Sequence, residues 1–251
     1  MKTCVLIPAF NCAALLPEVC RRVPGLSGSD EIIVVDDGSS DDTFKVAASL
    51  PRVAAFQNPR NSGYGATSSR LYMIALERNA DYTVNLHGDL GHRPEDVGPL
   101  LDRLKGGTAD VVMGSRLLFV RAAIAENWSG ALLNPTEVLA MPAHRVAGHV
   151  VLTAFQNVLF GSSLHSFHEG MRGCRKRVIQ WAAARELPAW YDYDMQLLFQ
   201  AFKAGFVIEE VPIRPSYDPR VRSAAPSVRY GLRVVANSVK LALGKAESER
   251  A

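Results

Sequence analysis

Short runs of apolar, often β-branched residues alternate along the chain with segments whose apolar residues recur at helical spacing. Strands are predicted over residues 3–8, 31–35, 53–57, 82–86, 110–113 and 206–213. Helices are predicted over about 14–22, 41–50, 68–78, 95–105, 143–159 and 175–185, and one more ends before Gly205. Strands that alternate with helices in this way are typical of an α/β fold, in which a mostly parallel sheet is flanked by crossover helices.

Two segments depart from this alternation. Residues 117–141 lose the clear period and are predicted to form a crossover loop, a kind of segment that often carries function. A last helix is predicted over about 228–243. Its apolar stripe is Val228, Leu232, Val235, Val239 and Ala242, and Arg229, Arg233 and Lys240 share one flank.

The charge distribution separates the end of the chain from the rest. From Arg214 onward there are eight basic and three acidic residues. We therefore divide the chain into one α/β domain over residues 1–218 and a basic C-terminal tail, with the amphipathic helix, over 219–251.

Composition narrows the class of protein. With 251 residues, 48% hydrophobic and 21% charged, the chain is expected to fold as an ordinary soluble protein. No apolar run is long enough to cross a membrane, and Pro8 and Asn11 interrupt the first one too early for a signal peptide. The formal net charge of +3 is too small to indicate nucleic-acid binding.

The four cysteines form no Cys-x-x-Cys pair, so neither disulfides nor structural zinc are expected. A reducing cytoplasm is the predicted location, either free or peripheral to the inner face of the membrane.

Acidic residues follow the second predicted strand. Asp36 and Asp37 stand where that strand ends, and ligands of doubly wound sheets bind outside the carboxyl ends of strands. A carboxylate there can accept hydrogen bonds from a nucleobase N–H or from ribose hydroxyls. We therefore interpret both as nucleotide ligands, whereas Asp41 and Asp42 are expected to cap the next helix or lie in solvent.

A second acidic site follows the strand over 82–86. Asp89 could hold a hard divalent cation that also binds two phosphates, in which case the metal would neutralise a diphosphate leaving group. Alternatively, His87 and Asp89 bond each other and the backbone in a tight turn. The residues by themselves leave both interpretations open.

Several motifs occur in a characteristic order. They are Ile7-Pro8-Ala9-Phe10-Asn11, Val35-Asp36-Asp37-Gly38-Ser39, Asn61-x-Gly63-x-Gly65, His87-Gly88-Asp89 and Gly114-Ser115-Arg116. Together they resemble the family 2 glycosyltransferases, whose Rossmann-like fold is called GT-A, and the resemblance covers most of residues 3–218. Within the family, the sequence is most similar to the polyprenyl-phosphate and dolichyl-phosphate mannosyltransferase branch.

The resemblance implies a set of site residues. It implies nucleotide contacts from Pro8, Ala9, Phe10, Asn11, Asp36, Asp37, Gly65, His87 and Gly88. It implies a Mg²⁺ or Mn²⁺ ion held by Asp89 and His87, acceptor or phosphate contacts from His168, Glu169 and Arg172, and catalytic roles for Asp89, Arg116 and Asp194.

The chain also departs from the family pattern. His87 replaces the first acid of the usual Asp-x-Asp motif, Gly91 stands where glutamine is common, and Ser166 occupies a position that is commonly acidic in the dolichyl branch. These departures motivate an alternative function, a catalytically impaired protein that binds a nucleotide sugar or a lipid headgroup on the same fold.

The predicted function is metal-dependent, inverting transfer of a sugar from a nucleoside-diphosphate sugar to a polyprenyl phosphate or a small-molecule hydroxyl. A phosphate acceptor is already ionised and needs no general base, whereas a hydroxyl needs one, for which Asp194, Asp192 and Glu169 are the candidates. The C-terminal helix is expected either to lie in a membrane interface or to pack on the domain or on a second subunit.

Overall fold

The protein is described here by a computed structural model that covers residues 1–126, 143–185, 187–214, 216 and 227–243. Its centre is a seven-stranded sheet with the order β3-β2-β1-β4-β6-β5-β7. The strands are β1 (Thr3–Ala9), β2 (Glu31–Asp36), β3 (Val53–Gln57), β4 (Tyr82–Asn85), β5 (Val111–Ser115), β6 (Arg172–Arg175) and β7 (Ile208–Pro212). All pairs are parallel except those of β6, which is antiparallel to both β4 and β5. The mostly parallel sheet predicted from the sequence is confirmed.

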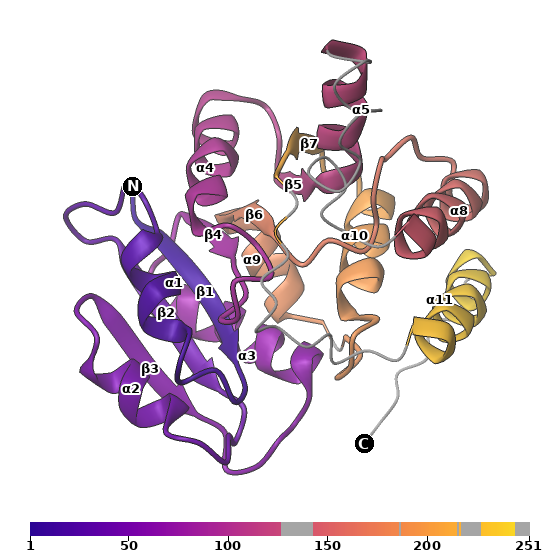
Figure 1. Cartoon of the computed structure of the whole chain (residues 1–251). Coiled ribbons are helices and arrows are strands. Elements are labelled where there is room, and N and C mark those ends of the chain that lie inside the picture. Colours follow the sequence, from indigo (N-terminus) through magenta and orange to yellow (C-terminus); the bar gives the residue numbers. More distant parts are fainter. Residues whose placement is uncertain (127–142, 186, 215, 217–226, 244–251) are drawn as a thin grey trace.

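Helices cover both faces of the sheet (Figure 1). They are α1 (Leu16–Arg22), α2 (Thr43–Ser49), α3 (Tyr64–Glu77), the 3-10 helix η1 (Pro94–Asp96), α4 (Val97–Gly106), α5 (Arg116–Glu126), α8 (Ala143–Phe160), α9 (Lys176–Ala183), α10 (Tyr193–Lys203) and α11 (Ser227–Ala242). Alternate residues of β1 enter the two resulting cores, with Leu6 on the side of α3, α9 and α10 and Ile7 on the side of α1 and α4. This alternation is the two-residue period of a strand buried on both faces.

The strand β6 was not predicted from the sequence. Its four residues, Arg-Gly-Cys-Arg, carry no run of β-branched residues that would signal a strand. Gly173 allows close packing there, because a Cβ at this position would lie 2.5 Å from Cδ1 of Leu104. Since β6 is antiparallel to its neighbours, its first residues lie beside the carboxyl ends of β4 and β5, where a ligand is expected.

The prediction of a loop over 117–141 was wrong for its first part. Residues Arg116–Glu126 form α5, which continues directly from β5. The apolar residues of this helix follow no amphipathic period, and for that reason the pattern did not reveal it. Residues 127–141 lie outside the described part of the chain.

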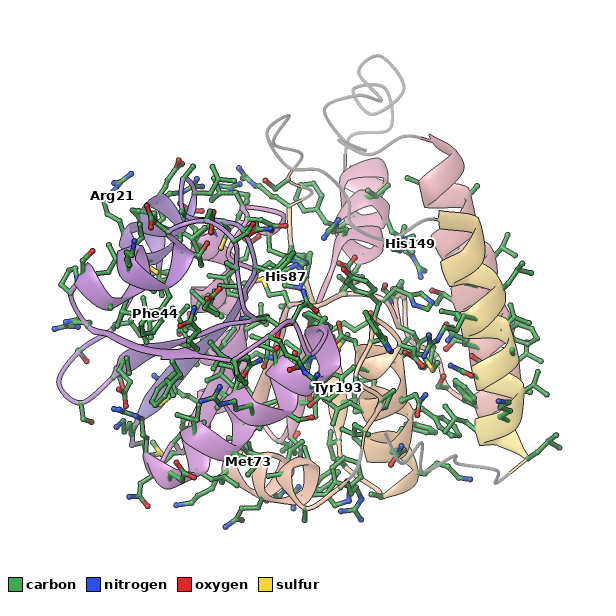
Figure 2. All side chains as sticks on the ribbon, turned by 90° about the horizontal axis from the view of Figure 1, so that it is seen from below. Arg21, Phe44, Met73, His87, His149 and Tyr193 are labelled. Carbon is green, nitrogen blue, oxygen red and sulfur yellow. The ribbon has the colours of Figure 1, made fainter. Side chains whose placement is uncertain are left out.

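Helices α8 and α11 lie side by side at one end of the molecule (Figures 1 and 2). Nε2 of Gln156 donates a hydrogen bond to Oγ of Ser238 at 3.1 Å, and Val234 and Leu241 of α11 are buried. The stripe predicted for α11 points elsewhere, since Leu232, Val235 and Val239 are exposed. Within the ranges that the structure describes, no helix is both long and apolar enough to span a membrane.

Candidate active site

The carboxyl ends of the parallel strands and the start of β6 bring the predicted site residues to one edge of the sheet. Asp36 is the last residue of β2, and Arg116 is the first residue after β5. His87 is the second residue after β4, from which Leu86 separates it. Figure 2 shows His87 near the centre of the molecule, between the N-terminal elements and the pair of α8 and α11. The carboxyl-end edge of the sheet therefore lies inside the molecule, where segments far apart in the sequence meet. We call this region the junction.

Asp37 organises the loop that precedes α3. Its Oδ1 accepts hydrogen bonds from Nδ2 of Asn58 at 2.7 Å and from the backbone N–H of Ser62 at 2.9 Å. Its Oδ2 accepts the N–H of Gly63 at 2.9 Å. A carboxylate can accept about four hydrogen bonds, so about one acceptor position of Asp37 is left for a ligand such as a nucleobase N–H.

Asp36 is completely buried and its oxygens are engaged within the protein. They accept hydrogen bonds from the Oγ hydroxyl of Ser39, from the Ser39 N–H, which is shared by both oxygens at 3.3 and 3.4 Å, and from Nε2 of Gln57 at 2.9 Å. In this arrangement Asp36 shapes the loop after β2, and any contact with a nucleotide would require one of these bonds to open.

The loop after β1 lies against the loop after β2. The N–H of Asn11 donates to Oγ of Ser39 at 2.8 Å, and Oδ1 of Asn11 accepts the N–H of Ser40 at 2.9 Å. Pro8 and Ala9 belong to β1, whereas the Phe10 side chain is half exposed. The Phe10 ring is therefore available to a ligand beside Asp37, whose N–H donates to the carbonyl of Ala9 at 2.8 Å.

Gly65 lies where the chain before α10 crosses the start of α3. A Cβ at Gly65 would lie 2.0 Å from the carbonyl oxygen of Pro188, and the Gly65 N–H donates to the carbonyl of Ala189 at 2.7 Å. Close backbone packing thus accounts for the glycine, and its predicted nucleotide contact stays a prediction.

We expect Asp37→Ala to weaken binding of the donor nucleotide by about 1–3 kcal/mol, because a buried hydrogen-bond acceptor is lost. The Asp37→Asn variant is the matched comparison, since it keeps one acceptor oxygen for Asn58 and Ser62. Calorimetric titration with nucleoside diphosphates measures the effect. Unchanged affinity of the alanine variant would exclude Asp37 from the base pocket.

His87 and Asp89 do not bond each other. Oδ1 of Asp89 accepts the N–H of Gly91 at 2.9 Å, which fixes the carboxylate, and no described donor binds Oδ2. Nε2 of His87 is buried without a hydrogen-bond partner and faces Gly170, where a Cβ would lie 2.3 Å from it. Gly88 packs similarly against Cys12, whose Sγ would be 3.0 Å from a Cβ at that position.

Arg116, His92 and Glu169 form a buried cluster. Nε of Arg116 lies 3.2 Å from Oε2 of Glu169, and Nη2 of Arg116 lies 2.9 Å from Nε2 of His92. Burial by itself raises the pKa of Glu169, but the positive charge of Arg116 outweighs it, and this pKa is lowered to about 2. Glu169 is therefore an anion at neutral pH.

Arg172 and Asp194 form a second buried pair. An ion pair joins Nη2 of Arg172 to Oδ1 of Asp194, and the arginine is only 1% exposed. The Tyr64 hydroxyl donates to both Asp194 oxygens, at 3.1 and 3.0 Å. Arg172 can thus reach an acceptor phosphate, and Asp194 can act as a base, only if this pair opens.

The two remaining base or acceptor candidates have other contacts in the structure. Asp192, the residue just before α10, is buried and accepts a hydrogen bond from Nδ2 of Asn237 of α11 at 2.7 Å. His168 packs edge-on against His149 of α8, with ring centroids 5.8 Å apart. Burial and the neighbouring His149 lower the pKa of His168 to about 3, so its imidazole is neutral at neutral pH.

Sequence reasoning missed two residues of this junction. Tyr64 contacts both Asp194, through its hydroxyl, and His87, through its ring. The Tyr64 and His87 rings pack edge-on with their centroids 5.6 Å apart, and the Tyr64 ring stacks on that of Tyr191 with centroids 6.0 Å apart. His92 is buried between Arg116 and Glu169. The only sequence signals were proximity to motifs, with Tyr64 between two glycines and His92 three residues after Asp89.

Comparison with known proteins gives concordant results. Residues 4–180 match the family model described as glycosyl transferase family 2. The chain is 28% identical over 218 residues to polyprenol monophosphomannose synthase of Mycolicibacterium smegmatis, covering 84% of this chain and 76% of that protein. It is 24% identical over 257 residues to UDP-N-acetylglucosamine–dolichyl-phosphate N-acetylglucosaminyltransferase of Methanococcus voltae, covering 96% of each.

Among solved structures, glucosyl-3-phosphoglycerate synthase from Mycobacterium tuberculosis is similar in fold. Its complex with Mn²⁺, uridine diphosphate and phosphoglyceric acid superposes with a TM-score of 0.68 at 20% identity, over 98% of this chain and 80% of that one. At this level of identity the likeness shows the fold alone.

Proposed function

The chain belongs to glycosyl transferase family 2, and from this premise we propose that it transfers a sugar, with inversion, from a nucleoside-diphosphate sugar to a polyprenyl phosphate. The observation that supports it best is the junction at the sheet edge. There the acceptor position of Asp37, the free Oδ2 of Asp89 and the partly exposed Arg116 follow the carboxyl ends of β2, β4 and β5, three strands of the same sheet. The nucleoside end of the donor would thus meet Asp37, and its diphosphate would meet Arg116 and a cation held by Asp89.

The contacts of Asp194 favour a phosphate acceptor over a hydroxyl. A hydroxyl must lose a proton as it attacks, and the candidate base Asp194 is engaged by Arg172 and Tyr64. An ionised phosphate oxygen can attack the anomeric carbon with no base. The names of the relatives from M. smegmatis and M. voltae point to the same acceptor class.

The residues present also fit a divalent cation. Asp89 offers an oxygen with no described donor, and the described side chains hold no cluster of three or more potential metal ligands. Such a sparse site suits Mg²⁺ or Mn²⁺, which complete their coordination with water and substrate phosphates. Solved structures of the similar synthase contain uridine diphosphate with Mn²⁺ or with Mg²⁺. When bound, the ion would neutralise charge on the diphosphate.

Incubation with a panel of nucleotide sugars and polyprenyl phosphate, with Mn²⁺ or Mg²⁺, tests the proposed function. Formation of the glycosylated lipid phosphate together with free nucleoside diphosphate is the expected result. Thermal stabilisation by the nucleotide sugar without release of nucleotide would instead support the alternative, a binding protein that has lost turnover.

We expect Mn²⁺ to support faster turnover than Mg²⁺. Manganese accepts imidazole ligands better than magnesium does, and His87 stands where the family usually has an acid. Because Nε2 of His87 faces Gly170, Nδ1 is the nitrogen of this ring that remains for a metal. His87→Asp should shift the preference toward Mg²⁺ in steady-state assays. Identical metal profiles of the two proteins would place His87 outside the coordination sphere.

A lipid acceptor requires contact with a membrane surface, and the pair α8–α11 supplies a suitable face. Each helix exposes an apolar stripe: Ala147, Val150, Val151, Ala154 and Val158 on α8, and Leu232, Val235, Ala236 and Val239 on α11, continued by Leu243 just after its end. Exposed apolar stripes on paired helices are typical of interfaces with lipid or with another protein.

We expect the chain to sediment with anionic vesicles at low salt and less so at high salt. Val151→Glu with Leu232→Glu should abolish sedimentation, because both charges would enter the lipid interface. The matched control is Met73→Glu, a half-exposed position on α3 far from α8 and α11 (Figure 2). If the parent protein stays in the supernatant and is a dimer that this double substitution dissociates, the face is a subunit interface instead.

A further inference from the structure

The Arg116 guanidinium joins its own chain segment to two others. Arg116 follows β5, Glu169 belongs to the segment before β6, and His92 lies in the loop after β4. These strands are neighbours in the sheet, in the order β4-β6-β5. The antiparallel direction of β6 is what delivers Glu169 to the same edge as the other two residues.

The contacts occupy one side of the Arg116 guanidinium. Nε forms an ion pair with Oε2 of Glu169 at 3.2 Å, and Nη2 bonds Nε2 of His92 at 2.9 Å and the carbonyl of Gly91 at 3.4 Å. Among the described residues, no hydrogen bond engages Nη1. The side chain is 20% exposed, so Nη1 is the part of the group that remains for a ligand.

Glu169 itself is too deeply buried to touch a substrate. It is 1% exposed, and its contacts are with Arg116 and, at 3.5 Å, with Nε2 of His92. His92 is 3% exposed and is equally enclosed. A buried carboxylate is tolerated only when a partner compensates its charge, so Glu169 and Arg116 depend on each other for position.

We propose that Glu169 and His92 are positioning residues, which hold the Arg116 guanidinium so that Nη1 meets the diphosphate that leaves the donor sugar. This inference rests on the proposed function and assigns Glu169 a role different from the acceptor contact expected from the sequence. In the transfer step, an acceptor oxygen bonds the anomeric carbon while the bond from that carbon to the diphosphate oxygen breaks. The electron pair leaves with the diphosphate, and a preorganised guanidinium stabilises the charge that develops there.

A double-mutant cycle tests this dependence. Glu169→Gln should lower kcat by about 10–100-fold in the parent protein, because a displaced guanidinium stabilises the leaving group less well. In an Arg116→Ala background the same substitution should change kcat by less than about twofold, since there is no guanidinium left to position. The matched control is Glu209→Gln, whose carboxylate pairs with Arg103 at the surface and which should leave kcat unchanged.

His92 provides a second, independent comparison. His92→Gln keeps a hydrogen-bond acceptor for Nη2 and should retain most of the activity, whereas His92→Leu removes the acceptor and should behave like Glu169→Gln. Thermal unfolding of every variant is measured in parallel. If Glu169→Gln does not fold, the two His92 variants test the proposal: a much lower kcat of His92→Leu than of His92→Gln supports it, and equal kcat values contradict it.

Equal losses of kcat in the parent and Arg116→Ala backgrounds would overturn the proposal, and so would a rise in KM for the acceptor alone. If the parent protein transfers no sugar from any donor, the proposed function fails separately. In that case, the dissociation constant for uridine diphosphate is measured without metal for the parent protein, the two single variants Glu169→Gln and Arg116→Ala, and the double variant. Non-additive losses in that constant support the positioning role, and additive losses refute it.

Discussion

Asp89→Ala is expected to lower kcat for sugar transfer by about 100-fold or more, because it removes the carboxylate that fits the divalent cation. Asp89 lies in the loop after β4, its Oδ1 is fixed by the N–H of Gly91, and no described donor engages its Oδ2. Only one hydrogen bond to the protein is lost on substitution, at a cost of about 1 kcal/mol or slightly more. The fold should therefore persist while transfer fails.

Release of free nucleoside diphosphate, measured at saturating metal, checks this prediction. Asp102→Ala is the matched control, since Asp102 is exposed on α4. It should keep the parent rate. Retention of most of the activity by Asp89→Ala would rule out this carboxylate as a metal ligand.

Asp194→Ala is expected to lower the free energy of unfolding by about 3–5 kcal/mol, the usual cost of leaving one member of a buried ion pair without its partner. The guanidinium of Arg172 is 1% exposed and pairs with Asp194, so removal of the carboxylate leaves a buried positive charge uncompensated. The Tyr64 hydroxyl loses its acceptor in the same substitution. Burial raises the pKa of the Tyr64 hydroxyl and persists in the variant, so this hydroxyl stays protonated at neutral pH and supplies no compensating negative charge.

Urea denaturation of the two proteins measures this difference. Asp42→Ala is the control, because its carboxylate is 68% exposed and pairs only with Lys45 in an exposed ion pair worth little. A variant Asp194→Ala with parent stability but no activity would contradict the structural role. It would revive Asp194 as a general base, and with it the hydroxyl acceptor.

The sequence predicted the framework of the fold well, because its signals are local. The apolar runs of β1 and β2 are each read from a few consecutive residues, and the motifs at their ends placed Asp36 and Asp37 at the sheet edge. The elements that were missed lack such signals. β6 has four residues with no β-branched side chain, and α5 has no amphipathic period.

The partners of the charged residues could not be predicted in the same way. The sequence singled out Glu169, Arg172 and Asp194 as candidates for an acceptor site, and the structure buries all three in ion pairs. Glu169 and its partner Arg116 are 53 residues apart along the chain, and Arg172 and Asp194 are 22 residues apart. No periodicity within either segment encodes such a pairing.

Membership of the α/β glycosyltransferases of family 2 could be recognised without the structure, since short motifs and strand periodicity depend only on neighbouring residues. Which carboxylates remain open to a ligand, and which are occupied by hydrogen bonds and ion pairs within the protein, depends on the three-dimensional packing. The protonation and the free hydrogen-bonding positions of a charged group depend on its burial and on opposite charges within a few ångströms. At this site those charges are brought together by the antiparallel strand β6, whose pairing with β4 and β5 is a long-range event.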